Sequence, residues 1–186
     1  DDVMDELRDA VRRELRMGFT PADEIVEVAV EVMDGQERLR PAAEHLFRVE
    51  SQALRREQAT WPAETDCDRL DRAFEALEER GIVARQNFSC CQSCGSREIW
   101  GEVDEAEEMG MDVRGHTYYH VQDTEGAVEG GGLHLAYGAM EEGGIVDVGR
   151  EIVEVLNAHG LATDWNGSPD LRIHVQLDWK RRRDDL

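Results

Sequence analysis

Hydrophobic residues recur at helical spacing through the first half of the chain. An apolar residue at every third or fourth position forms the buried stripe of an amphipathic helix, and a glycine just past the stripe is a common helix end. The pattern predicts four helices, and Trp61–Pro62 ends the third because the residue before a proline is disfavoured in a helix. The stripes are Val3, Leu7, Val11 and Leu15; Ile25, Val28, Ala29, Val32 and Met33; Ala43, Leu46, Phe47 and Leu54; and Leu70, Ala73, Phe74 and Leu77.

The second half of the chain alternates strand patterns with helical ones. In the last pattern Leu171, Ile173 and Val175 alternate with polar residues, as in a strand with one face on a core and the other facing water or a partner. A glycine triplet at 130–132 predicts a turn. The predicted order is strand 82–88, helix 98–109, strands 116–122 and 133–137, helix 145–159, and a closing hairpin of strands 161–165 and 171–179.

This order of elements predicts an α+β fold, in which N-terminal helices are followed by a mixed, mostly antiparallel sheet with helices mainly on one face. The expected divisions are a helical region at 1–64, an α+β domain at 65–183 that carries a cysteine cluster, and a tail at 184–186. The basic run at 180–183 is expected to be a solvated terminus, with an electrostatic tether to an acidic partner as the alternative.

The chain is strongly acidic. Across 186 residues, 21 Lys and Arg stand against 42 Asp and Glu, a formal net charge of −21. Such a charge repels phosphates, so we expect neither a nucleic-acid groove nor binding to an anionic membrane surface. No apolar run approaches the roughly 18 residues that cross a bilayer. A protein partner or a homo-oligomer is compatible with this composition.

The four cysteines are unevenly spread, because Cys90, Cys91 and Cys94 crowd into five positions. A disulfide framework spreads its cysteines more widely, so we expect reduced thiols and a cytoplasmic protein. The remaining cysteine, Cys67, lies on the same helical stripe as Leu70, which makes it a small buried core residue.

Cys91 and Cys94 form a C-x-x-C pair where a strand ends and a helix is expected to begin. This spacing suits zinc, which takes two thiolates about one turn apart, with Cys90, His120 or Asp123 as further ligands. It also suits a dithiol redox site, because a helix N-terminus lowers the pKa of a thiol and a second thiol resolves the disulfide. A purely structural role is the third interpretation.

A second group of polar residues follows the strand predicted at 116–122. His116 and His120 have an H-x-x-x-H spacing, but four strand residues separate their Cα atoms by about 13 Å, too far to chelate one ion. His120 stays of interest because Asp123 and Glu125 follow it, and these three residues are candidates for a small-ligand site. In the plainer interpretation, Asp123 or Thr124 caps a short helix.

Three blocks of sequence, 87–95, 118–125 and 132–138, carry a resemblance to a known family. Together they resemble an uncharacterised domain-of-unknown-function family of actinobacterial proteins, over roughly 61–183. The resemblance implies a bacterial cytoplasmic protein and supplies no activity. It directs attention to Cys90, Cys91, Cys94, His120 and Asp123.

Three functions stay open. We favour a non-enzymatic intracellular binding domain whose cysteine cluster is structural or holds zinc, because the sequence has no nucleophile elbow, phosphate loop or H-E-x-x-H motif. The second is a thiol-based redox enzyme or sensor that uses Cys91 and Cys94. The third is small-ligand binding at the turn from His120 to Glu125.

Overall fold

The computed structural model describes residues 2–186 and divides the chain into two compact units. A helical unit holds the N-terminal residues up to 65 together with 180–186, and an α+β unit holds 66–179. Seven α-helices and a five-stranded mixed sheet in the described residues confirm the predicted α+β class with its N-terminal helices. None of these helices is long and apolar enough to cross a membrane.

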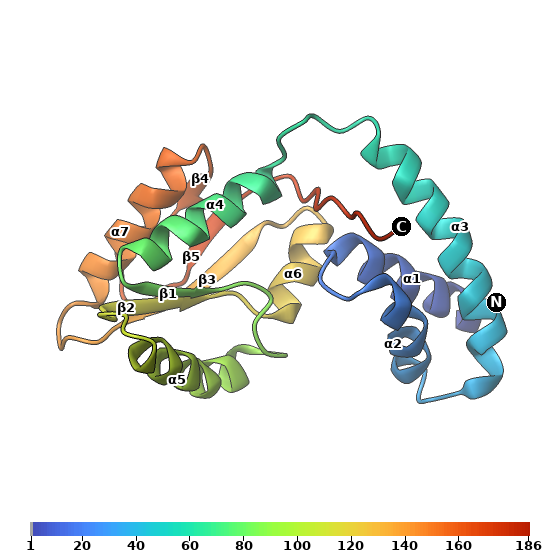
Figure 1. Ribbon diagram of the computed structural model, residues 1–186, viewed down its shortest axis with the longest axis horizontal. Helices are drawn as coiled ribbons and strands as arrows, with labels where there is room; N and C mark the ends of the chain where they lie inside the picture. The colour runs from blue at the N-terminus through green and yellow to red at the C-terminus, as the bar shows by residue number, and fades with distance from the viewer. Residues whose placement is uncertain (1) are drawn as a thin grey trace. The chain divides into compact units, whose positions relative to one another are not determined.

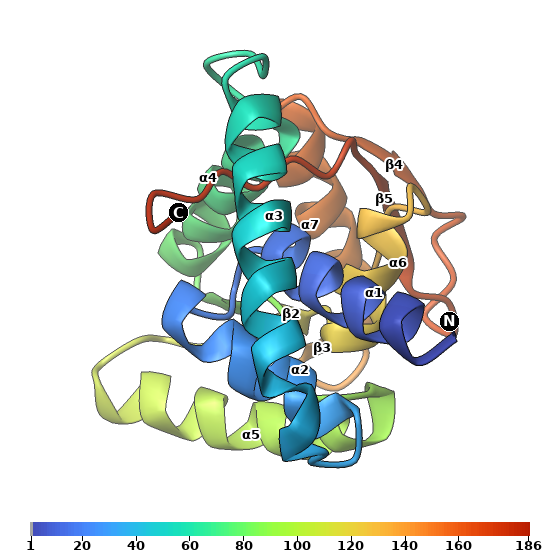
Figure 2. The same ribbon diagram turned by 90° about the vertical axis from the view of Figure 1, so that its right-hand side faces the viewer.

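The helical unit consists of three helices that pack against one another (Figure 2). Most residues of their apolar stripes meet in one core, with Leu7, Ile25 and Leu46 among its buried members, whereas Val3 and Val32 of the predicted stripes are exposed. Burying such stripes is the main favourable contribution to folding, which is why the sequence pattern located these helices. They are α1 (Asp2–Met17), α2 (Ile25–Val32) and α3 (Arg40–Gln58), with short 3-10 turns at Ala22–Glu24 and Glu37–Leu39.

The basic run near the chain end packs within the helical unit. The Arg183 side chain is only 3% exposed, and its guanidinium donates to the carbonyls of Glu14, Leu15 and Thr20. These carbonyls lie at or just past the end of α1, where unpaired acceptors and the helix dipole favour a cation. The expected solvated terminus is therefore wrong for Arg183, because α1 supplies acceptors that bind the guanidinium in place of water.

The α+β unit contains four helices and all five strands. The strand order is β1-β2-β3-β5-β4, in which β1 and β2 are parallel and the other pairs are antiparallel. The parallel pair requires a crossover, which the helix α5 provides. The elements are α4 (Asp66–Glu79), β1 (Ile82–Arg85), α5 (Gln92–Glu108), β2 (Gly115–Tyr118), α6 (Val121–Val128), β3 (Leu133–Ala139), α7 (Ile145–Ala158), β4 (Ala162–Asp164) and β5 (Ile173–Gln176).

Helices cover both faces of the sheet, whereas the sequence pattern predicted them mainly on one face. α4 contacts β1 and α7 contacts β3 on one face, and α5 lies on the other (Figure 1). α5 packs through Ile99 and Val103 against Val83 and Tyr118. Because alternate strand residues point to opposite faces, a strand covered on both sides is apolar at successive positions. Three of the four residues of β1 are accordingly buried.

Several element boundaries differ from the sequence pattern: β1 ends at Arg85 and β5 covers only Ile173–Gln176, and two further differences lie beside the cysteines and histidines. α5 begins at Gln92 rather than at 98, so Cys94 lies in its first turn. β2 ends at Tyr118. Val121, which the sequence pattern placed in this strand, is instead the first residue of α6. The first turn of α5 has no apolar stripe by which to recognise it. α6 is capped by His120, a residue type outside the usual set of helix N-caps.

Candidate functional site

The cysteine cluster, defined as Cys90, Cys91 and Cys94, lies at an edge of the sheet where two helices begin. β1 and β2 run parallel, so their carboxyl ends meet at the same edge. α5 follows β1 and α6 follows β2, which brings both helix N-termini to that edge. In open α/β sheets, ligands bind outside the carboxyl ends of the strands, and helix N-termini offer unpaired N–H groups there.

The loop between β1 and α5 is held in place by α6. Asn87 and Ser89 adopt positive φ angles of 50° and 65°, which non-glycine residues seldom do. The Asn87 side chain accepts a hydrogen bond from the Thr124 hydroxyl at 2.8 Å. The Ser89 carbonyl accepts a hydrogen bond from the Val121 amide at 3.0 Å. These bonds fix the backbone immediately before the cysteine cluster.

The first turn of α5 rests on the ring of Tyr118. The Tyr118 hydroxyl donates a hydrogen bond to the Gln92 carbonyl at 3.2 Å. Gly95 approaches the ring so closely that a Cβ atom at this position would lie 2.5 Å from Cε2. Glycine permits this approach because it carries no side chain. Tyr118 therefore sets the position of the helical turn that carries the C-x-x-C pair.

Three thiols form one compact group. Cys91 is the N-cap residue of α5, Cys94 lies in the first turn, and Cys90 comes just before them. The Sγ atoms of Cys90 and Cys91 are 3.8 Å apart, and all three Sγ atoms lie within 4.8 Å of one another. A tetrahedral zinc ion with Zn–S bonds of about 2.3 Å has sulfur–sulfur edges of about 3.8 Å. The group is thus close to the arrangement of three thiolates on one ion.

The surroundings of Cys91 favour its thiolate. Its pKa is lowered to about 6, chiefly by a hydrogen bond with the Ser93 hydroxyl and further by the Cys94 backbone N–H. The Ser93 Oγ atom lies 3.4 Å from the Cys91 sulfur. The pKa of Cys90 is raised, mainly through its hydrogen bond with Cys94. Cys91 is therefore mostly a thiolate at neutral pH, and the thiolate is the form that binds metals and attacks disulfides.

His120 and Asp123 form a capping box at the start of α6. The Asp123 amide donates to His120 Nδ1 at 3.3 Å, and the Asp123 carboxylate accepts from the His120 amide at 3.1 Å. Arg172 donates to both carboxylate oxygens of Asp123, each at 3.0 Å. Burial lowers the pKa of His120, opposed by the Asp123 charge and assisted by Arg172. Glu125 is a partly buried residue of the same helix.

Only part of the predicted site is brought together. Among residues 2–186, the cysteine cluster is the one group of three or more His, Cys, Asp or Glu side chains whose ligand atoms lie close enough together to hold a metal ion. His120 and Asp123 are not members of it, and their part in a ligand site stays a prediction. Cys67 is 1% exposed in α4, which confirms its prediction as a core residue.

Three residues of this region were missed by the sequence analysis: Gly95, Tyr118 and Arg172. The nearest signal for Gly95 was its position directly after the C-x-x-C pair. Arg172 is 49 positions from Asp123 in the sequence, and only its place on the polar side of the last strand pattern distinguished it. No local pattern predicts contacts of this kind, because they depend on how the strands are ordered.

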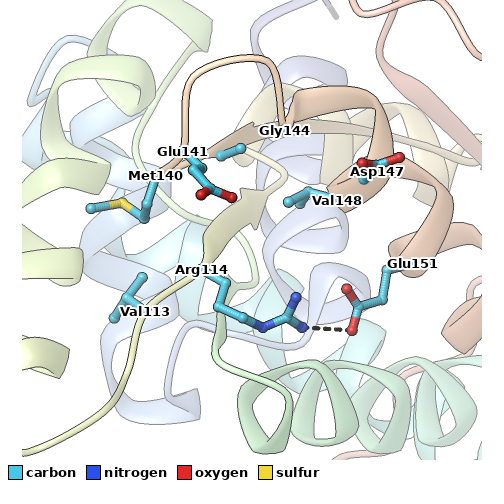
Figure 3. Close-up of a pocket in the computed structure, with 9 residues that line it drawn as sticks. Val113, Arg114, Met140, Glu141, Gly144, Asp147, Val148 and Glu151 are labelled. Atoms are coloured by element: carbon cyan, nitrogen blue, oxygen red, sulfur yellow. Dashed lines mark hydrogen bonds and ion pairs between the residues drawn. The ribbon is translucent and has the colours of Figure 1, made fainter.

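A separate cavity lies near the amino end of β2, at the opposite edge of the sheet from the cysteine cluster (Figure 3). It has a volume of about 440 Å³, and its lining includes Val113, Arg114, Val148 and Glu151. Figure 3 shows Arg114 and Glu151 reaching toward one another, in an ion pair of 2.6 Å. Because this carboxylate already neutralises the guanidinium, we assign no ligand to the cavity.

Comparison with known proteins places the chain in a family. A family model described as "Domain of unknown function (DUF6891)" matches residues 1–183. The chain belongs to this family. The predicted resemblance to an uncharacterised family is thereby confirmed, and the DUF6891 match includes the N-terminal helices as well. No curated protein and no solved structure matches the chain. DUF6891 membership supplies no activity, so the function has to be argued from the site.

Proposed function

We propose that this DUF6891 protein binds a thiophilic divalent ion, zinc by preference, through the thiolates of Cys90, Cys91 and Cys94. The observation that carries this proposal is the 3.8 Å separation of the Cys90 and Cys91 sulfurs, within three thiols that all lie inside 4.8 Å. Soft thiolate ligands favour zinc over magnesium or calcium. A cytoplasmic location, where thiols stay reduced, would keep all three available.

The pKa of Cys91 supports metal binding. A thiol must lose its proton to become a ligand, so metal affinity falls when the thiol pKa is high. With a pKa of about 6, Cys91 is mostly ionised at neutral pH. It can therefore anchor an incoming cation, which the sulfurs of Cys90 and Cys94 then help to bind. The formal net charge of −21 also favours the approach of cations.

Three protein ligands leave the fourth position of a tetrahedral ion to water or to an exogenous ligand. Structural zinc sites are closed by four protein ligands, whereas sites with three keep an exchangeable position. Cys90 is exposed, and Cys91 and Cys94 are partly exposed. These features support a binding domain that exchanges its ion with solution, and they favour this role over an ion buried permanently in a core.

The metal content of each chain tests the proposal. Protein purified without chelators is expected to carry about one zinc ion per chain, measured by mass spectrometry of an acid-digested sample. Competition with a chromophoric chelator then gives the affinity. Serine at Cys90, Cys91 or Cys94 should weaken zinc binding roughly tenfold or more, because each substitution removes a thiolate ligand.

Two variants serve as matched controls. Cys67→Ala removes the one thiol outside the cluster, which is buried in α4, and Asp123→Asn removes the nearby carboxylate charge. Both should retain the full zinc stoichiometry once circular dichroism shows that they are folded. A chain that neither carries nor takes up zinc would contradict the proposal. Undiminished affinity in all three serine variants would also contradict it.

A further inference from the structure

We propose that a small-molecule disulfide controls the metal occupancy of the cysteine cluster, by converting Cys91 and Cys94 to a disulfide bond and releasing the ion. This regulation rests on the zinc site proposed above. It depends on three properties of the cluster: which two thiols can be joined, how an oxidant reaches them, and what is left to hold the ion.

Backbone geometry selects the pair of cysteines. Protein disulfides join Cα atoms that are about 4.4–6.8 Å apart. The Cα atoms of the sequence neighbours Cys90 and Cys91 are only about 3.8 Å apart across a trans peptide bond. Cys91, the N-cap residue, and Cys94 are three positions apart across the first turn of α5, and an ideal helix separates such Cα atoms by about 5 Å. Of the two partners available to Cys91, Cys94 is therefore the one with which it can close a disulfide without backbone strain.

The cluster is open to an oxidant. All three thiols are exposed or partly exposed, in contrast to the buried Cys67. Cys91 stands at the N-cap of α5, where unpaired backbone N–H groups favour a nucleophilic thiolate. A guanidinium nitrogen of Arg97 lies 3.8 Å from the Cys94 sulfur. This cation can attract a carboxylate-bearing disulfide to the cluster.

The oxidation is a thiol–disulfide exchange in two steps. The Cys91 thiolate attacks one sulfur of the small disulfide R–S–S–R, whose S–S bond breaks, and one RS⁻ leaves. The Cys94 thiolate then attacks the Cys91 sulfur of the mixed disulfide, and the second RS⁻ leaves. Two protein thiolates have lost two electrons, and the oxidant has become two thiolates that take protons from water. Zinc keeps its charge throughout.

Release of the ion follows from the loss of ligands. Of the three thiolates, only Cys90 remains after the disulfide forms. No other described residue joins the compact group of metal-binding side chains, so water competes with a single protein ligand. Reduction of the disulfide by a thiol restores the three-thiolate set, which makes the release reversible.

The experiment uses the zinc-loaded full chain and oxidised glutathione as the probe. A chromophoric chelator reports released zinc, and peptide mass spectrometry maps the disulfides. We expect one ion released for each Cys91–Cys94 disulfide formed, and renewed zinc binding after dithiothreitol. Cys94→Ser should stop at a glutathione adduct on Cys91, Cys90→Ser should still form the internal disulfide, and Cys67→Ala should behave as the unmodified chain.

The zinc content before oxidation separates the two proposals. A chain that loads zinc and keeps it while the cluster is oxidised overturns the regulation and leaves the zinc site standing. Release of zinc with glutathione adducts alone, or with a disulfide that includes Cys90, also overturns it. A chain that loads no zinc overturns both the regulation and the proposed function.

Discussion

Gly95 and Tyr118 are in close contact at the start of α5, where a Cβ atom on Gly95 would lie 2.5 Å from the tyrosine ring. The contact joins the helix that begins at the cysteine cluster to the strand β2 beneath it. It also accounts for a glycine directly after Cys94, at a helical position where glycine is intrinsically unfavourable. The positions of the three thiols thus depend on Gly95, which has no reactive side chain.

Gly95→Ala should destabilise the protein and weaken zinc binding. Overpacking against the Tyr118 ring costs about 1–3 kcal/mol, of which the better helix propensity of alanine restores up to about 1 kcal/mol. Urea unfolding and chelator competition measure the two effects. Gly101→Ala, on the same helix with no neighbour within 4 Å of its Cβ position, is the control and should be neutral or slightly stabilising. Equal behaviour of the two variants would contradict the role given to Tyr118.

Ser93→Ala should raise the pKa of Cys91. The hydrogen bond with Ser93 is the main cause of its lowered value of about 6, so removing the hydroxyl should move the pKa toward that of an ordinary thiol. The rate of iodoacetamide alkylation of the metal-free protein against pH measures this, with the modified cysteine identified by peptide mass spectrometry. Ser96→Ala, an exposed serine one turn further along α5, is the control. An unchanged pH profile in Ser93→Ala would exclude the hydrogen bond as the cause.

The stability of the α+β unit should fall on acidification because of His116. Burial lowers the pKa of His116 below its ordinary value of 6.5, and its Nδ1 atom has no hydrogen-bond partner among the described residues. The unfolded chain therefore takes up the proton first. Stability is full above about pH 6.5 and declines as the pH falls through the lower folded-state pKa. His116→Leu should flatten this decline in urea unfolding between about pH 7 and pH 5. An identical slope in the variant would rule out His116 as its source.

Arg183→Ala should destabilise the helical unit by roughly 2–3 kcal/mol, because hydrogen bonds to charged groups are strong and the carbonyls of Leu15 and Thr20 would lose their donor. Amide hydrogen exchange along α1 and urea unfolding measure the loss. Arg38→Ala is a matched control, since Arg38 is exposed and bonds to its neighbour Gln36, and it should change stability by less than about 0.5 kcal/mol. A similarly small effect of Arg183→Ala would mean that its bonds contribute no net stability.

The sequence by itself determined every described helix except α6, most of the strands and the cysteine cluster. Helical stripes and strand alternation are local, because a buried face repeats at the period of the element that carries it. The three cysteines are neighbours along the chain, so their proximity followed once a helix began near them. The burial of Cys67 followed in the same way from its helical stripe.

The tertiary structure decided which residues from distant parts of the sequence contact one another. Tyr118 lies beneath Gly95, and Arg172 pairs with Asp123 from 49 positions away, because strand order brings separate segments together. Packing within the helical unit likewise buries Arg183 against the end of α1. Such contacts depend on three-dimensional topology, and no periodicity along the chain encodes them.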